Sequence, residues 1–219
     1  MKSAFQPELL WPLGHRELTL LVVPDLRRDH DLANMITKVR TVLHQHPATD
    51  RPVPNEWLHL TVQPINHKLD RAPIEPAARM RLIAELSILF ATLPSFTLLL
   101  GSVLAYNTGA VTDIHDDEPF DYLVDRVRAI VAKVCGQGSI GYDTRPGHMA
   151  VAYAHGEQEI DPLQRQLRRI RPSHAKLTVD SVVLAEVRQD PAECVYRWEV
   201  VRQFSLAAPI RTSGETCAS

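Results

Sequence analysis

This 219-residue sequence has few aromatic side chains and no surplus of positive charge. Aromatic residues make up 6% of the chain, so an extended base-stacking surface is not expected. The 24 basic and 26 acidic residues give a formal net charge of −2. A protein that binds nucleic acid without sequence preference needs a basic surplus to displace counterions. Recognition of a nucleotide or an RNA end would therefore have to be local.

Long apolar runs and patterned cysteines are also missing. The longest early apolar run, from Leu18 to Val23, is too short to span a bilayer and lacks the flanks of a signal peptide. The cysteines, Cys135, Cys194 and Cys217, are widely spaced and form neither a disulfide framework nor a CxxC metal pattern. We therefore expect a cytoplasmic, monomeric protein with no membrane association.

The hydropathy pattern predicts alternating helices and strands in a globular chain. Hydrophobic residues make up 45% and charged residues 23% of the sequence. Periodicity predicts strands at 17–23, 57–65, 96–106, 110–114, 148–154, 176–188 and 194–206, and helices at 31–45, 74–93, 119–135 and 160–170. Each half has a helix, a loop with proline or glycine, and a strand that carries a histidine. The prediction is an α+β fold with a weak internal duplication, in which residues 1–206 form one bilobal domain and residues 207–219 a flexible tail.

Two similar tetrapeptides lie on these histidine-bearing strands: residues 59–62 read His-Leu-Thr-Val, and residues 148–151 read His-Met-Ala-Val. Alternate side chains on a strand share a face. His59 and His148 are therefore expected to face a common cleft while the apolar residues anchor each strand. The same alternation places Thr61, Gln63, Ala150 and Ala152 on the histidine side, and Leu60, Val62, Met149, Val151 and Tyr153 on the opposite side.

Two opposed histidines suit phosphodiester chemistry. A neutral imidazole can take a proton from an attacking water or hydroxyl, and a protonated one can give a proton to the leaving oxygen. The hydroxyl of Thr61 could hold a phosphate oxygen between the two rings, and the scheme needs neither a metal nor another cofactor. A single histidine on a strand is usually structural or merely exposed. The matched pair, His59 and His148, favours the catalytic interpretation.

The two tetrapeptides resemble the signature of the 2H phosphoesterases, in particular the 2′-5′ RNA ligase-like branch. That signature is two copies of His-x-Thr/Ser-x, where x is apolar. Residues 59–62 match it fully, and residues 148–151 match it except that Ala150 stands in place of the hydroxyl residue. Segments 56–58, 152–154 and 196–198 also look like that branch, and the resemblance spans about residues 17–206.

The resemblance implies a bilobal fold in which two antiparallel sheets face a central cleft and helices lie outside. It also implies catalysis by His59 and His148, with hydrolysis of 2′,3′-cyclic phosphates, or 2′-5′ ligation or cleavage of RNA. The resemblance further implies that the substrate is a nucleotide or an RNA terminus with a cyclic phosphate, and that the protein acts in RNA processing.

Ala150 removes one hydrogen-bond donor from the expected phosphate site. A hydrogen bond to a charged group contributes about 1.5–3 kcal/mol, so its loss slows a reaction roughly ten- to hundredfold. Tyr142 or Arg145, in the loop before His148, could reach the phosphate instead, and the forked donors of arginine suit that role. Both residues are also compatible with an ordinary loop.

Three functions stay open on the sequence alone. The first is a metal-independent cyclic phosphodiesterase acting on an RNA terminus or a small nucleotide. The second is a binding module for nucleotide or RNA that kept the cleft but lost efficient turnover. The third uses the same scaffold on a small-molecule phosphate ester that is not RNA. The near-neutral charge and the scarcity of aromatic residues favour a small substrate over a long RNA.

Overall fold

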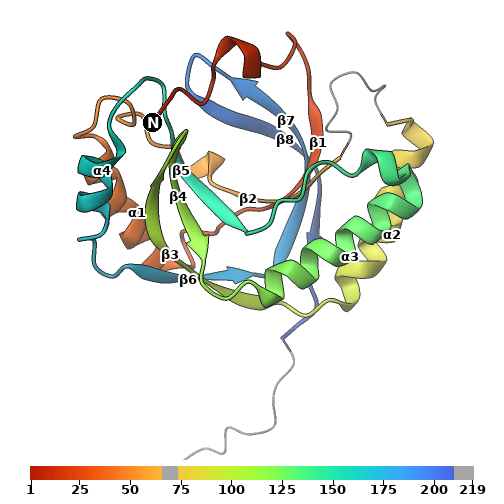
Figure 1. Cartoon of the computed structure of the whole chain (residues 1–219). Helices are drawn as coiled ribbons and strands as arrows, with labels where there is room; N and C mark the ends of the chain where they lie inside the picture. The colour runs from red at the N-terminus through yellow and green to blue at the C-terminus, as the bar shows by residue number, and fades with distance from the viewer. Residues whose placement is uncertain (66–73, 210–219) are drawn as a thin grey trace, which may run out of the picture.

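The computed structural model describes residues 1–65 and 74–209 (Figure 1). Within these residues the strands are β1 (Glu17–Val22), β2 (Leu60–Ile65), β3 (Phe96–Tyr106), β4 (Gly109–Ile114), β5 (His148–Tyr153), β6 (His174–Val179), β7 (Ser181–Asp190) and β8 (Val195–Ser205). The α-helices are α1 (His30–Leu43), α2 (Pro76–Thr92), α3 (Glu118–Cys135) and α4 (Ile160–Leu167). The predicted α+β class is confirmed.

The strands form one curled antiparallel sheet in the order β6-β3-β4-β5-β2-β1-β7-β8. Its two halves meet between β5 and β2, where Leu60 and Met149 form a single ladder pair. Two separate sheets were expected, but the structure has one sheet, whose two halves diverge from this pair. Helices α1 and α4 pack on the half that contains β3 and β6, and α2 and α3 pack on the half that contains β2 and β8 (Figure 1).

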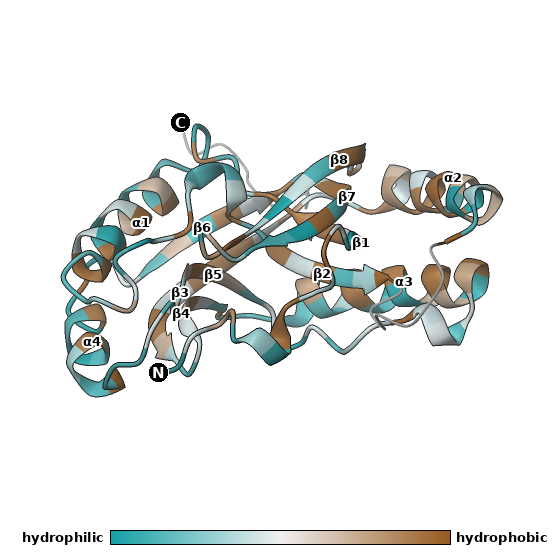
Figure 2. Cartoon of the chain, turned by 90° about the horizontal axis from the view of Figure 1, so that it is seen from above, coloured by the Kyte–Doolittle hydropathy of each residue, from teal (hydrophilic) through white to brown (hydrophobic). Residues whose placement is uncertain are grey.

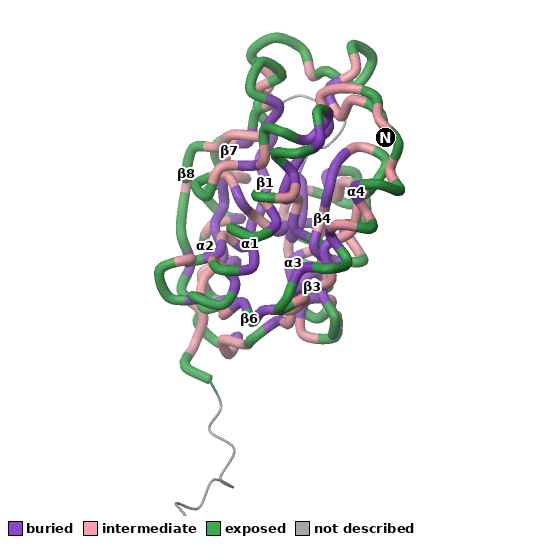
Figure 3. Tube along the Cα trace, turned by 90° about the vertical axis from the view of Figure 1, so that its left-hand side faces the viewer, coloured by how far each residue is buried: buried purple, intermediate pink, exposed green. Residues whose placement is uncertain are grey.

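Apolar helix faces and strands build the core. Helix α1 buries the residues that its periodicity predicts, namely Leu32, Met35, Ile36, Val39 and Leu43. Figure 2 shows hydrophobic residues along β5, in the middle of the sheet, and Figure 3 shows that buried residues concentrate in the central strands while exposed ones follow the loops and outer helix faces. Each fully buried leucine or isoleucine contributes about 1.5–3 kcal/mol, so the two histidine-bearing strands are firmly anchored.

Both histidine-bearing strands contain a β-bulge at the same distance from the histidine. In β2, Thr61 pairs with Leu21 while Gln63 pairs with Leu20, which leaves Val62 as the extra residue. In β5, residue 150 pairs with residue 111 of β4 and residue 152 pairs with residue 110, which likewise leaves Val151 as the extra residue. A bulge interrupts the in-out alternation of a strand. Side chains beyond residues 62 and 151 therefore face the side opposite to the one that strict alternation predicts.

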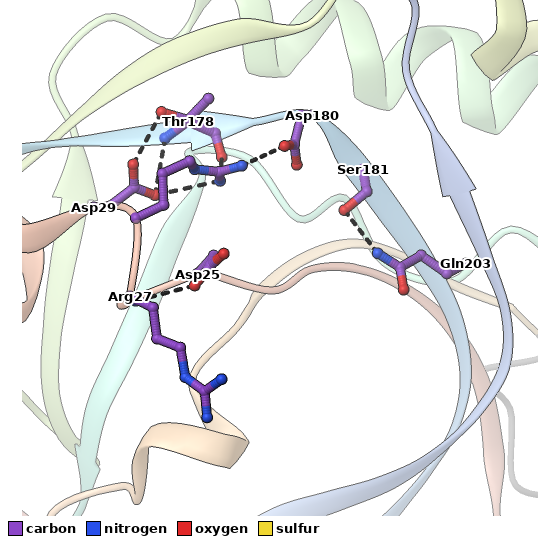
Figure 4. A network of polar contacts seen from close by, with 8 residues as sticks. Asp25, Arg27, Asp29, Thr178, Asp180, Ser181 and Gln203 are labelled. Carbon is purple, nitrogen blue, oxygen red and sulfur yellow. Dashed lines mark hydrogen bonds and ion pairs between the residues drawn. The ribbon is translucent and has the colours of Figure 1, made fainter.

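The single strand predicted at 176–188 is two strands, because the chain passes at Asp180 from one half of the sheet to the other. A polar network holds this junction (Figure 4). The Asp29 carboxylate accepts hydrogen bonds from the backbone N–H of Thr178 at 3.2 Å and from its hydroxyl at 2.9 Å. Arg28 donates to the Thr178 carbonyl at 2.8 Å and pairs with Asp180. Strand alternation in the sequence carries no sign of such a crossing.

Two further boundaries differ from the sequence expectation. Residues 55–57 form a 3-10 turn, so the strand predicted from residue 57 begins at Leu60. The tail was predicted to fray from residue 207. In the structure, however, the backbone N–H of Ala207 donates a hydrogen bond to the Leu93 carbonyl at 2.8 Å. Residues 210–219 of that tail lie outside the described residues.

Candidate active site

His59 and His148 have matching positions on either side of the Leu60–Met149 pair, each one residue before its member of the pair. The Nδ1 atom of His59 lies 2.9 Å from the carbonyl oxygen of Trp57, and that of His148 lies 3.1 Å from the carbonyl oxygen of Pro146. A carbonyl oxygen only accepts, so Nδ1 carries the proton in both rings. Nε2 is therefore the nitrogen of each ring that is available to a ligand.

Both rings line one cleft of about 270 Å³. Its wall is formed by residues from five strands, the N-terminal segment, the residue before β2 and the loop before β5, namely Trp11, Glu17, Thr19, Leu21, His59, Thr61, Pro64, Tyr142, His148, Tyr153, Val187 and Tyr196. The expectation that the two histidines share a cleft is consistent with this lining. The strand halves that diverge from the Leu60–Met149 pair create the space between them.

The local backbone at His148 depends on Gly147. A Cβ atom there would lie 2.4 Å from Cδ1 of Ile114 and 2.6 Å from the ring of Phe120, so no larger residue fits without displacing the core. The N–H of Ile114 also donates to the Gly147 carbonyl at 3.2 Å. The glycine thus lets the chain pass close over α3 and β4 immediately before the histidine.

His59 is more enclosed than His148, whose side chain is exposed. Desolvation in this enclosure lowers the pKa of His59, and the charge of the nearby His148 lowers it further, while the hydrogen bond to the Trp57 carbonyl opposes both. Part of the enclosure comes from Trp198, whose ring lies edge-on to that of His59. The neutral form of His59 is therefore favoured near neutral pH.

The other residues predicted for the site lie in different places. Thr61 and Tyr142 line the cleft with the two histidines. Desolvation and the charge of Glu17 raise the pKa of Tyr142 to about 12, so its hydroxyl keeps its proton. Ala150 pairs with Val111 across β4 and is not part of the cleft wall.

Arg145 is engaged outside the cleft lining. Its guanidinium donates to the Asp143 carboxylate at 2.7 and 2.9 Å and to the Asp125 carboxylate at 3.0 Å. These bonds use one donor on each of its three nitrogen atoms, that is, three of the five N–H donors of the guanidinium. The arrangement gives no support to the predicted contact between Arg145 and a phosphate.

Two side chains face the opposite way from the sequence prediction, because of the bulges. Gln63 was expected to face the cleft, but it is fully buried and its carbonyl oxygen accepts from Arg128 at 2.8 Å. Tyr153 was expected to point away from the cleft, yet it forms part of the wall. Its ring lies 5.3 Å from that of Tyr196 and 5.7 Å from that of Phe5, measured between centroids.

Sequence reasoning also missed the contribution of the N-terminal segment. The backbone N–H of Trp11 donates to the Gln189 side chain at 2.7 Å, and the Trp11 ring lies 5.8 Å from that of Tyr196. Phe5 contacts Tyr153 of one half of the sheet and Tyr196 of the other. No periodicity or motif in residues 1–16 indicates this packing, which depends on the curl of the sheet.

The described residues that line the cleft include no lysine or arginine. They include one carboxylate, that of Glu17, which is 4% exposed. Across residues 1–65 and 74–209, no three His, Cys, Asp or Glu side chains gather as a metal site. Over the same ranges, no helix has the length and apolarity to cross a membrane.

The curled sheet, with His59 directly before β2 and His148 at the start of β5, has the fold of the 2H phosphoesterases, as the paired tetrapeptides suggested. No known family profile matches the chain, and no curated protein matches it by sequence. Solved structures do match in fold. The protein TT0787 of Thermus thermophilus superposes with a TM-score of 0.66 at 16% identity, over 88% of this chain and 98% of that one.

Two other solved structures agree with this assignment of the fold. One described as a phosphoesterase has a TM-score of 0.61 at 14% identity, and it covers 88% of this chain and 99% of its own. E. coli LigT in its apo form has a TM-score of 0.58 at 15% identity, over 88% of this chain and 98% of LigT. The predicted 2H phosphoesterase-like fold is confirmed by these likenesses.

Proposed function

We propose that this protein is a metal-independent phosphodiesterase that opens the 2′,3′-cyclic phosphate of an RNA end or a small nucleotide. The observation that carries the proposal is the matched pair of histidines. Each binds a carbonyl two residues earlier through Nδ1, and both line one cleft. Such a pair can serve one phosphate from two sides, which is what general acid–base hydrolysis requires.

The unequal surroundings of the rings suggest their roles. His59, whose pKa is lowered, acts as the base, because it is neutral near pH 7. Its Nε2 takes a proton from water as the water oxygen bonds to phosphorus. The exposed His148 acts as the acid, and its Nε2–H gives a proton to the ribose oxygen as the phosphorus–oxygen bond breaks. The product is a ring-opened phosphate monoester, and a water molecule is consumed.

The hydroxyls of Thr61 and Tyr142 are the proposed donors to the non-bridging phosphate oxygens, since both side chains line the cleft with the histidines. Ala150 offers no donor at the second motif. Arg145 is left out of the proposed phosphate site, because it does not line the cleft and its charge is paired with the carboxylates of Asp125 and Asp143. With no arginine in the described wall, hydroxyls and a protonated imidazole carry the binding of the anion.

Likeness in fold to E. coli LigT supports a nucleotide as the substrate class. LigT has been crystallised with 3′-AMP, in a structure that superposes on this chain with a TM-score of 0.58, and with phosphate, with a TM-score of 0.57. The cleft of about 270 Å³ in this chain has the size for one nucleotide rather than for several.

The test is hydrolysis of 2′,3′-cyclic nucleotides by the purified protein with EDTA present. We expect turnover that survives the chelator and is lost in His59→Ala and His148→Ala. If the protein binds a nucleotide monophosphate but turns over no substrate, it is a binding module and not an enzyme. Turnover of other phosphodiesters but of no cyclic nucleotide would assign the scaffold to a different small-molecule ester.

A further inference from the structure

The N-terminal segment, residues 1–16, is bonded to both halves of the sheet. On one side, the backbone N–H of Ala4 donates to the carbonyl of Ala154, the residue after β5, at 2.7 Å. On the other side, the backbone N–H of Trp11 donates to the side chain of Gln189 on β7, also at 2.7 Å. Figure 1 shows the segment, in dark red, passing from the side of β4 and β5 to that of β7 and β8. The segment therefore bridges the two halves away from the single ladder pair in the middle of the sheet.

Aromatic rings join the two halves at the place where this segment crosses. The ring of Tyr153, on β5, lies 5.3 Å from that of Tyr196, on β8, measured between centroids. Phe5 lies 5.7 Å from the first ring and 5.5 Å from the second, and Trp11 lies 5.8 Å from that of Tyr196. Trp11, Tyr153 and Tyr196 are also part of the cleft wall. Rings at these separations are in contact, so the cleft is closed at this end, which we call the aromatic end.

The histidines lie near the open side of the cleft, within reach of the aromatic end. The side chain of His148, the first residue of β5, is exposed, whereas Tyr153 is the last residue of that strand, about 16 Å away at the usual rise. On β8, Tyr196 lies two residues, or about 7 Å, from Trp198, whose ring contacts that of His59. A phosphate between the two histidines is therefore separated from the aromatic end by the space of one nucleoside.

The shape of a cyclic nucleotide decides what meets the aromatic end. The 2′,3′-cyclic phosphate is fused to one edge of the ribose, and the base and the 5′ carbon project from the opposite edge. With the phosphate at the histidines and the base stacked on the aromatic rings, the 5′ carbon also points inward. In an RNA terminus this carbon continues into the next nucleotide. That nucleotide would meet the closed end, and its phosphate would find no lysine or arginine in the described wall to neutralise it.

We infer, building on the proposed function, that the N-terminal segment restricts the substrate to a free nucleoside 2′,3′-cyclic phosphate and excludes RNA termini, with Trp11 as the specificity-determining residue. Trp11 belongs to the segment and its ring also lines the cleft. Its backbone is held by Gln189, and its ring rests on that of Tyr196. Phe5 fixes the same segment against both halves from outside the cleft wall. Removal of the Trp11 ring opens the aromatic end while leaving both histidines in place.

The experiment compares kcat/KM on adenosine 2′,3′-cyclic phosphate with kcat/KM on a short RNA that ends in the same cyclic nucleotide. For the wild-type protein we expect the free nucleotide to be favoured by roughly tenfold or more, because the RNA has to separate several aromatic pairs before it can bind. In Trp11→Ala this ratio should fall several-fold toward one. The ratio is the readout, so a loss of stacking that lowers turnover of both substrates does not affect it.

Leu13→Ala is the matched control. Leu13 lies in the same segment, two residues after Trp11, but its side chain is fully exposed and is not part of the cleft wall, so the ratio should stay at its wild-type value. Equal kcat/KM of the wild-type protein on the two substrates would overturn the inference and leave the proposed function intact. A preference for the free nucleotide that persists in folded Trp11→Ala and Phe5→Ala proteins would overturn the role of the segment.

A binding measurement separates this inference from the proposed function. Calorimetric titration of the wild-type protein with adenosine 3′-monophosphate and with a short RNA that ends in the same 3′-phosphate reports the exclusion of RNA without turnover. Tighter binding of the monophosphate with no hydrolysis of any cyclic phosphate would support the closed aromatic end and refute the phosphodiesterase. Equal affinity for the two ligands would refute the exclusion of RNA. Neither result depends on whether a variant folds.

Discussion

The ring of Trp198 lies edge-on to the ring of His59, with the centroids 5.0 Å apart and the planes 75° from parallel. Trp198 belongs to β8, at the sheet edge, whereas His59 precedes β2 near its middle, so the curl of the sheet creates this contact. Trp57, whose carbonyl holds His59, packs on the same indole at 5.0 Å. The indole therefore shields from water a ring whose neutral form is the proposed base.

We expect Trp198→Leu to move the acidic limb of the kcat/KM profile to higher pH. Exposure of His59 to water removes part of the desolvation that lowers its pKa, so the pKa rises and the ring is protonated over more of the acidic range. Trp198→Phe keeps an aromatic edge on the ring and should keep the limb near its wild-type position. A limb that stays fixed in Trp198→Leu would refute this role for the indole.

The two histidines should behave as one catalytic unit. His59→Ala and His148→Ala should each remove nearly all turnover, and the double variant should lose little more, because neither half of an acid–base pair works alone. The wild-type profile of rate against pH should be bell-shaped. Full activity in His148→Ala would refute the pairing, and circular dichroism of both variants checks that they fold.

The difference between Thr61 and Ala150 predicts opposite effects of two substitutions. Thr61→Ala should lower kcat/KM roughly ten- to hundredfold, since it removes a donor to the phosphate. Ala150→Thr should raise turnover of a cyclic nucleotide if the side chain fits beside Val111, its partner on β4. Steady-state kinetics with phosphate titrations measures both. Unchanged binding and turnover in Thr61→Ala would show that the phosphate does not lie at the first motif.

Gly147 should be intolerant of a side chain. In Gly147→Ala the new methyl group would meet Ile114 and Phe120 well inside normal contact distance, so the core must shift. Overpacking of this kind costs about 1–3 kcal/mol in the free energy of unfolding, and here it would also displace His148. Urea denaturation and kcat should both report the change. Gly156→Ala is the control, because a Cβ atom at Gly156 meets nothing within 4 Å.

The elements and the two histidines could be predicted because they depend on local patterns. Neighbouring residues in the sequence are enough to show the apolar spacing of α1 and α3. They are also enough to show the alternation around His59 and His148. The sides of Gln63 and Tyr153 could not be predicted, because each follows a bulge that is defined by the partner strand. Trp11 and Glu17 were missed for a related reason. Their place in the cleft depends on how the sheet curls, which no short window of sequence encodes.

The single pair between Leu60 and Met149 has a mechanical consequence for the two histidine rings. The junction between β2 and β5 is held by one ladder pair, so it resists opening far less than the junction between β7 and β8, which is held by many pairs. The angle between the two halves of the sheet therefore sets the gap between His59 and His148. If the proposed function holds, a phosphate bound by both imidazoles links the two halves across this gap, so the ligand stiffens the sheet where it is weakest. Under that proposal the substrate helps the scaffold to hold the distance between the two rings.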